Sequence, residues 1–290
     1  MNTIKRIIIY SVTLIAAMFF AASCTKEDSL NNQIPLKYAN EENPYEWIGI
    51  AHNDILYSIG TSLQETLMAY LQKDSLTHDD FLFIEDTFMV VARNLMEQYA
   101  TEVSVDDILS GIYSDTSNTS INIDSLAYAI LIEATSQFED ATGMIELTRI
   151  KEAEILHELY PDDPSTDTVK KDPAWVEQRE LTLATLSVFR NSLSFWEDAM
   201  VNDANPWHGL LVNELDIPKQ EPTVGALIPW FKRLVSHLFP PMAEKPVANI
   251  AAYDAAGALM GFASFGLSGA CITGATYSGL GALGSIFQKK

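Results

Sequence analysis

The chain has 290 residues and a formal charge of −21, with 39 acidic and 18 basic side chains. An apolar content of 48% is enough for a hydrophobic core, so the composition excludes a disordered or collagen-like protein. The charge argues against a nucleic-acid-binding protein, because binding to phosphates requires clustered lysine and arginine. Two cysteines are too few for a disulfide scaffold or a cysteine-rich zinc site.

Residues 1–23 have the layout of an export signal. Lys5 and Arg6 supply its positive start, and an apolar run follows from Ile7 to Phe20. This run is shorter than the roughly 20 apolar residues that a membrane-spanning helix needs. The segment therefore predicts that the chain is exported.

Small residues lead from the apolar run to a cysteine, in the order Ala21, Ala22, Ser23 and Cys24. This arrangement resembles the lipobox of bacterial lipoproteins, in which the signal is cut before a cysteine that becomes lipidated. Ala21 departs from the leucine that is usual three residues before that cysteine. The resemblance implies that Cys24 carries a lipid anchor. A plain secretory signal, in which Cys24 has no role, is the alternative.

Acidic residues follow the cysteine almost at once. Lys26, Glu27 and Asp28 resemble the short export tag of Bacteroidota-type lipoproteins that reach the outer face of the outer membrane. The resemblance implies a lipid-anchored outer-membrane protein that is exposed on the cell surface. Two or more acyl chains give a stable anchor, because each buried methylene contributes about 0.8 kcal/mol. The polar residues 24–42 are expected to form a flexible tether.

Helical periodicity begins at residue 43. The sequence Asn-Pro-Tyr-Glu at 43–46 is typical of an N-cap, a proline at the first helical position and an acid at the third. Apolar residues then recur at helical spacing up to Leu71. Thr77, with Asp80 three residues later, predicts the start of a second helix.

Two longer helices are expected further along the chain. One covers about residues 122–160, with Gly143 as its predicted kink, and the other covers about residues 172–200. Strands have little support, because no alternating apolar pattern is bounded by hairpin turns. We therefore predict an all-α fold, an irregular multi-helix bundle with a helical domain at 43–245 and a Gly/Ala-rich helical segment at 246–290.

The stretch from Ala255 to Phe287 has no charge and contains 8 of the 14 glycines. Gly257, Gly261, Gly274 and Gly279 are predicted to pack helices, because small residues four positions apart let two helix backbones approach closely. In composition and spacing the stretch resembles the glycine-zipper segments of small pore-forming bacteriocins. Two interpretations follow: a helical hairpin or helix packed on the domain, or a segment that inserts into a bilayer.

No group of residues forms a convincing catalytic or metal site. Glu154 and His157 make one Glu-x-x-His, whereas a di-iron bundle needs two such pairs and two further glutamates. With Glu152 beside them, they are predicted to belong to a solvated acidic face. Cys271 has no basic neighbour in sequence and is predicted to be a small buried hydrophobic residue. We therefore expect no metal and no cofactor.

Trp207 and His208 follow an Asn-Pro pair in a segment predicted to be a loop. One interpretation is a helix start whose aromatic ring fixes the helix to the core. The other is a ligand-binding patch in which the ring of Trp207 stacks on a sugar.

Taken together, these features favour a non-enzymatic binding or interaction protein at the cell surface, anchored to the membrane by its N-terminal lipid. Its partner is expected to be a protein or a glycan. The alternative is a membrane-active protein, bacteriocin-like or pore-forming, that acts through its C-terminal segment. An enzyme stays open as a further alternative, because active sites in all-α proteins assemble from residues scattered along the sequence.

Overall fold

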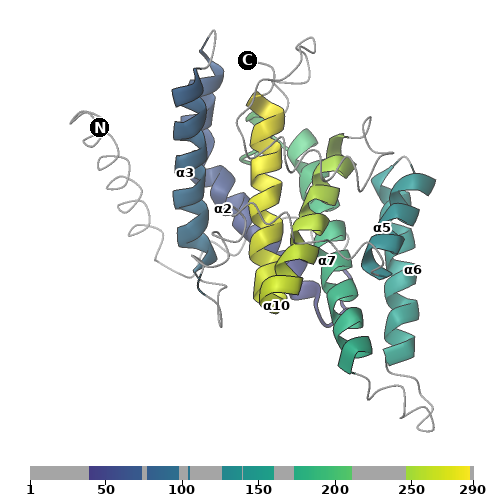
Figure 1. Ribbon diagram of the computed structural model, residues 1–290. Coiled ribbons are helices and arrows are strands. Elements are labelled where there is room, and N and C mark those ends of the chain that lie inside the picture. The colour runs from purple at the N-terminus through teal and green to yellow at the C-terminus, as the bar shows by residue number, and fades with distance from the viewer. Residues whose placement is uncertain are drawn as a thin grey trace, which may run out of the picture. The chain divides into compact units, whose positions relative to one another are not determined.

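A computed structural model describes residues 39–73, 77–97, 104, 126–138, 140–159, 173–210 and 246–287. Within these ranges every regular element is a helix, which confirms the predicted all-α class. The helices are α2 (Glu46–Leu71), α3 (His78–Met96), α5 (Leu126–Gln137), α6 (Ala141–Leu159), α7 (Pro173–Val201) and α10 (Pro246–Phe287) (Figure 1). The export signal, Cys24 and the acidic tag lie outside the described residues, so their roles stay predictions.

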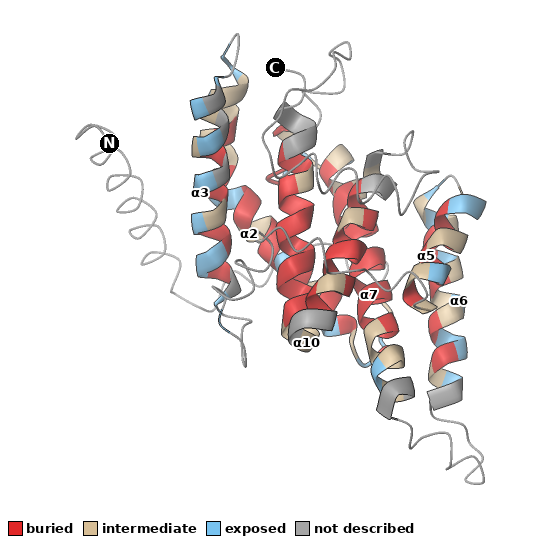
Figure 2. Cartoon of the chain, in the orientation of Figure 1, coloured by how far each residue is buried: buried red, intermediate tan, exposed pale blue. Residues whose placement is uncertain are grey.

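Helix α7 is the central element of the described body. Every residue from 182 to 196 is buried, because α2, α5, α6 and α10 all pack against this helix (Figure 2). A helix that is buried on all its faces belongs to the core rather than to the surface. Helix α3 lies further out, since it packs on α2 and has fewer contacts with α10.

Helix α2 buries one apolar stripe, as its periodicity predicts. Its residues are four or seven positions apart, a spacing that places their side chains on one face of a helix. Each of its members is at most 2% exposed: Ile48, Ile55, Ile59, Leu63 and Leu67. Leucine and isoleucine side chains buried to this degree each contribute about 1.5–3 kcal/mol relative to an exposed position.

The predicted N-cap of this helix at Asn43 is wrong. The helix begins at Glu46, with Tyr45 at the capping position and no hydrogen bond from a capping side chain. Asn43 instead closes a turn, in which its Oδ1 accepts a hydrogen bond from the backbone N of Tyr45 at 2.9 Å. The amide group of Asn43 donates to Glu152 and to the carbonyl of Leu183, and Glu46 is the first helical residue and forms an ion pair with the buried Arg190.

The structure confirms the helix start predicted at Thr77, which is the N-cap of α3 and forms a capping box with Asp80. The Thr77 hydroxyl accepts a hydrogen bond from the backbone N of Asp80 at 3.3 Å. In return, Oδ2 of Asp80 accepts one from the backbone N of Thr77 at 2.8 Å. Two donors that the first turn of a helix leaves unpaired are thereby satisfied.

Replacement of Thr77 by alanine is expected to lower the free energy of unfolding by about 1 kcal/mol, because it removes this cap. Thr61→Ala is the control, since the exposed Thr61 hydroxyl donates only to a backbone carbonyl within α2, that of Tyr57. Urea unfolding should show a change within about 0.5 kcal/mol for the control. Equal losses in the two variants would contradict a specific role for the cap.

The single helix predicted over residues 122–160 is wrong, since α5 and α6 are separate helices that pack against each other. Gly143 is not a kink. Its backbone N donates to Oδ1 of Asp140 at 2.8 Å, in the first turn of α6. A Cβ on Gly143 would lie only 2.2 Å from Cδ1 of Phe138, so glycine makes room for this ring where the chain turns back.

Helix α10 consists of two arms joined at Gly266, which has φ 65° and ψ −152°. Only glycine readily adopts this backbone conformation. A Cβ on Gly257 would lie 2.9 Å from the carbonyl O of Thr273, and one on Gly261 would lie 2.1 Å from that of Gly269. The pairing of these positions shows an antiparallel hairpin whose backbones touch at glycine.

The other two predicted packing glycines fit the hairpin onto neighbouring helices. A Cβ on Gly274 would lie 3.3 Å from Cδ2 of His52 in α2, and one on Gly279 would lie 2.4 Å from Cε2 of Phe88 in α3. Most of the hairpin's described side chains are buried among α2, α3 and α7 (Figure 2). Among the described residues, no helix has both the length and the apolar composition to cross a membrane.

Candidate functional site

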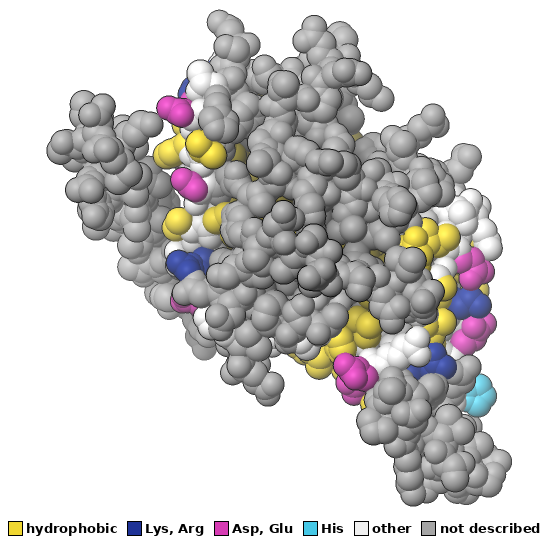
Figure 3. Space-filling view, viewed as in Figure 1, with side chains coloured by type: hydrophobic (Ala, Val, Ile, Leu, Met, Phe, Trp, Pro, Cys, Tyr) yellow, Lys and Arg dark blue, Asp and Glu magenta, His cyan; other side chains and the backbone are white. Residues whose placement is uncertain are grey.

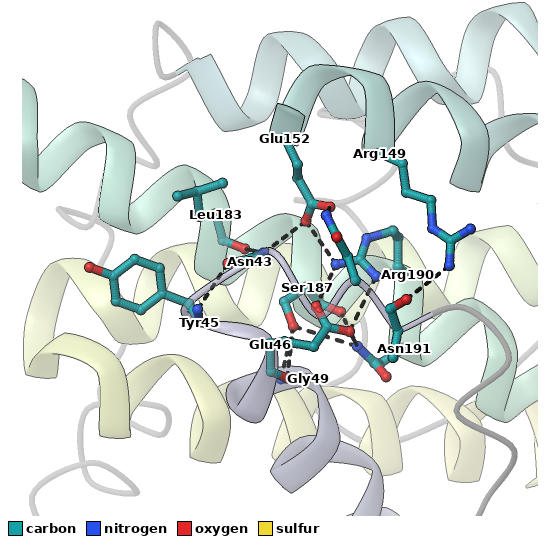
Figure 4. A network of polar contacts seen from close by, with 12 residues as sticks. Asn43, Tyr45, Glu46, Gly49, Arg149, Glu152, Leu183, Ser187, Arg190 and Asn191 are labelled. Carbon is teal, nitrogen blue, oxygen red and sulfur yellow. Dashed lines mark hydrogen bonds and ion pairs between the residues drawn. The ribbon is translucent and has the colours of Figure 1, made fainter. Parts of the chain in front are cut away.

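Two clusters of polar side chains are buried between helices, one joining α2, α6 and α7 and the other joining α2, α7 and α10. The first, named here the Arg190 cluster, consists of Glu46 at the start of α2, Glu152 on α6 and Arg190 on α7 (Figure 4). Nη2 of Arg190 lies 2.5 Å from Oε2 of Glu46 and 2.8 Å from Oε1 of Glu152. The Arg190 and Glu152 side chains are fully buried, and that of Glu46 is 9% exposed.

Amide groups complete the hydrogen bonding of the two carboxylates. Asn191 donates to Oε1 of Glu46 at 2.7 Å, and Asn43 donates to Oε1 of Glu152 at 2.9 Å. Asn40 donates to the remaining oxygen, Oε2 of Glu152, at 2.8 Å. Every carboxylate oxygen of the cluster therefore accepts at least one hydrogen bond, which a buried charge requires if it is not to destabilise the fold.

The Arg190 cluster has two carboxyl groups for one guanidinium group, so it holds an excess negative charge when both glutamates are ionised. Burial raises the pKa of Glu152 above its ordinary value, while the charge of Arg190 and the hydrogen bonds from Arg190 and Asn40 oppose this shift. The nearby Glu46 adds to the rise. The folded state therefore holds a proton on Glu152 more tightly than the unfolded chain does.

This direction gives a sign for the pH dependence of stability. A carboxyl group whose pKa is raised by folding stabilises the folded state at low pH, and this contribution is lost as the pH rises through the raised pKa. The loss begins above the ordinary pKa of glutamate, about 4.3. We expect Glu152→Gln to make the free energy of unfolding depend less on pH between about pH 5 and pH 8.

Urea unfolding across this pH range measures the effect. Glu154→Gln is the matched control, because Glu154 is an exposed glutamate on the same helix and the substitution removes the same charge. The control should keep the pH dependence of the wild-type chain. A Glu152→Gln variant with the slope of the wild type would show that Glu152 does not titrate in this range.

The second cluster, named here the Asp254 cluster, consists of His52, Ser192, Trp196 and Asp254, which are all fully buried. Asp254 is the only charged residue in α10. Its Oδ2 accepts hydrogen bonds from the Ser192 hydroxyl and from Nε1 of Trp196, the latter at 3.3 Å. Nε2 of His52 lies 3.5 Å from the same oxygen. Asp254 thus ties the hairpin to α2 and α7.

Ser192, His52 and Asp254 have the residue types of a hydrolytic triad, but not its arrangement. In a triad the imidazole lies between the hydroxyl and the carboxylate, so that it can take the proton of the nucleophile. Here the hydroxyl of Ser192 donates directly to Asp254, and the other imidazole nitrogen of His52 lies 3.0 Å from Oδ1 of Asn53. Because all three side chains are also fully buried, the cluster is a polar junction between helices.

The ligand-binding interpretation of Trp207 is wrong. Its ring is fully buried, and it packs edge-on against Trp196 with the centroids 5.4 Å apart. Its Nε1 donates to the backbone carbonyl of Leu56 at 2.9 Å. A buried ring cannot stack on a sugar. Trp207 instead packs in the core, as the first of the two interpretations predicts. His208 is half-buried beside it, with Nδ1 2.9 Å from the carbonyl O of Ala199.

The predicted solvent exposure of the acidic face on α6 is confirmed for Glu154 and His157 and wrong for Glu152. Glu154 and His157 are exposed, whereas Glu152 is buried against Arg190. Within the described part of the chain, no group of three potential ligands is placed to hold a metal ion. The expectation that Cys271 is a buried hydrophobic residue is confirmed, and burial raises the pKa of its thiol.

Neither cluster was predicted from the sequence, although an isolated charged residue in an apolar segment indicates each of them. Arg190 is the only charged residue between Glu180 and Glu197, and Asp254 stands alone at the edge of the uncharged C-terminal stretch. A single charge within a strongly apolar helix is seldom buried without a partner. An isolated charge therefore indicates that Arg190 and Asp254 have polar partners, but it does not identify the partner residues.

Comparisons with known proteins found no relative of this chain. No family model, curated protein or solved structure matches the chain.

Proposed function

We propose that the chain is an exported lipoprotein, anchored to the outer membrane through Cys24 and exposed on the cell surface, whose helical body binds a partner without catalysing a reaction. The observation that carries this proposal is the order of residues around Cys24. An apolar run and small residues precede the cysteine, and Lys26, Glu27 and Asp28 follow it. These features resemble those of surface lipoproteins.

The packing of α10 supports anchoring by lipid rather than by the C-terminal segment. Large side chains of the hairpin, such as Leu259, Ile272 and Leu283, are at most 5% exposed inside the helical body. Insertion into a bilayer would have to remove them from these contacts and would also expose the buried Asp254. Membrane activity through this segment is therefore the weaker hypothesis.

The burial of both polar clusters supports a binding role over a catalytic one. The side chains of Arg190, Glu152, His52 and Asp254 are fully buried, so a substrate in solution cannot reach them without a rearrangement of the core. Their hydrogen bonds join helices to one another. In this proposal the exposed surface, rather than an internal site, meets the partner.

The charge of that surface favours one class of partner. Removal of Lys5 and Arg6 with the signal leaves 39 acidic and 16 basic side chains. Figure 3 shows acidic side chains beside hydrophobic ones on the described surface. Leu82 and Val90 on α3 and Ile150 on α6 are each nearly half exposed. A protein with basic side chains complements such a surface better than an anionic glycan does.

Protease treatment of intact cells, combined with metabolic labelling by a palmitate analogue, tests the anchor and its location. We expect the native chain to incorporate the label, and to be degraded by an external protease while periplasmic marker proteins stay intact. Cys24→Ala should abolish the label. A chain that remains unlabelled, or that the protease reaches only after the cells are broken, would contradict the proposal.

A further inference from the structure

The residues just before α2 form a short segment, 39–45, named here the strap. It is built from successive turns rather than from a helix. The backbone N of Asn43 donates to the carbonyl of Asn40 at 2.9 Å, and that of Glu46 donates to the carbonyl of Asn43 at 3.0 Å. The polar sequence predicts a flexible tether at residues 24–42. That boundary is wrong, because residues 39–42 already belong to the folded body.

Two asparagines, Asn40 and Asn43, fix the strap to α6 and α7, and Figure 4 shows the contacts of Asn43. Asn40 donates to Oε2 of Glu152 at 2.8 Å, and Asn43 donates to Oε1 of the same side chain. Asn43 also donates to the carbonyl of Leu183 in α7 at 3.0 Å. Because Glu152 is fully buried, loss of these donors would leave a buried carboxylate with fewer hydrogen bonds.

Both ends of the strap have further contacts. At the start, Nη2 of Arg149 on α6 donates to the carbonyl of Ala39 at 2.9 Å. At the end, the Tyr45 hydroxyl donates to Oε1 of Glu180 on α7 at 2.7 Å. The strap is thus fixed to two helices that follow it by more than 100 residues in the chain.

We propose that the strap is a fixed junction that sets the point at which the anchored N-terminal segment leaves the body, beside α6 and α7. The inference rests on the proposed function, in which Cys24 holds the chain on a membrane. A pull on the anchor would then act first on the contacts of Asn40 and Ala39 with α6. The pull would not act directly on the start of α2, because the strap lies between the anchored segment and this helix.

The contacts of the strap also define which helices of the body lie next to the anchored segment. Helix α6 packs on α5 and α7, whereas α3 packs on α2 and α10. The junction therefore lies beside α6 and α7. The exposed Leu82 and Val90 belong to α3, which is not among the helices that the strap contacts.

Hydrogen–deuterium exchange of the full mature chain in detergent, read by mass spectrometry, tests the junction. In the wild type we expect the backbone amides of Asn43, Tyr45 and Glu46 to be protected, since each is hydrogen bonded. The variant Asn40→Ala/Arg149→Ala removes two side-chain contacts of the strap without touching Arg190. It should speed exchange in 39–45 at least about tenfold and leave α7 unchanged.

Lys151→Ala is the matched control, because it removes an ion pair with Glu154 on the outer face of the same helix. This variant should exchange as the wild type does. Strap amides that exchange in the wild type as fast as those of an unstructured peptide would overturn the proposal. A double variant that loses protection in α7 to the same extent would also overturn it, because the contacts would then support the whole body. Failure of the lipid anchor is detected separately, by absence of the palmitate label.

Discussion

Arg190→Met is expected to lower the free energy of unfolding by about 3–5 kcal/mol. Arg190 is the only positive partner that the structure gives to Glu46 and Glu152 within the Arg190 cluster. Methionine fills most of the volume but leaves two carboxylates, one of them fully buried, without an opposite charge. Removal of one partner from a buried ionic group costs far more than the net contribution of the intact group. Urea unfolding followed by circular dichroism measures the loss.

Two further variants show whether the loss comes from unpaired charge. Lys151→Met removes an exposed ion pair and should change stability by less than about 1 kcal/mol. The triple variant Arg190→Met/Glu46→Gln/Glu152→Gln has no charge left in the cluster and should recover part of the loss. A triple variant less stable than Arg190→Met would show that volume and hydrogen bonds, rather than charge, determine the cost.

Gly261→Ala is expected to destabilise the chain by about 2 kcal/mol, although alanine is the better helix former. The added Cβ would lie 2.1 Å from the carbonyl O of Gly269 and 2.6 Å from Oγ1 of Thr273, so the two arms of α10 would have to move apart. Backbone atoms cannot move out of the way as the end of a flexible side chain does. The same methyl group in an open part of the helix would be favourable.

Gly281→Ala provides that comparison within the same hairpin. Its Cβ would lie 3.6 Å from the nearest neighbouring atom, Cδ2 of Tyr253, which is an ordinary contact. We expect it to raise stability by up to about 1 kcal/mol through helix propensity. Thermal unfolding of both variants should therefore show shifts of opposite sign. Two shifts of the same sign would contradict the close packing of the arms.

Local patterns predicted the parts of the fold that depend on neighbouring residues. The capping box of Thr77 and Asp80 needs only residues three positions apart, and the buried stripe of α2 needs only helical spacing. The glycines of α10 indicated close helix packing for the same reason. The break between α5 and α6 was missed, because it depends on where the ring of Phe138 folds back over Gly143.

The buried clusters depend on contacts that no local pattern contains. Arg190 is 144 residues from Glu46 and 38 from Glu152, so the partners meet only once three helices have packed. Glu152 has acidic neighbours in sequence, and this local pattern predicts a solvated face. Trp207 donates to the carbonyl of Leu56, 151 residues away, and its burial follows from that packing rather than from its own loop.

Flotation of the unlipidated mature chain, residues 25–290, with liposomes tests the central claim most directly. The claim is that the C-terminal hairpin is part of the protein core and that the lipid on Cys24 is the anchor. The account predicts that this chain stays at the bottom of the gradient and releases no dye from the liposomes. A chain that floats with the liposomes, or that releases dye from them, would show that the hairpin enters the bilayer and would contradict the account.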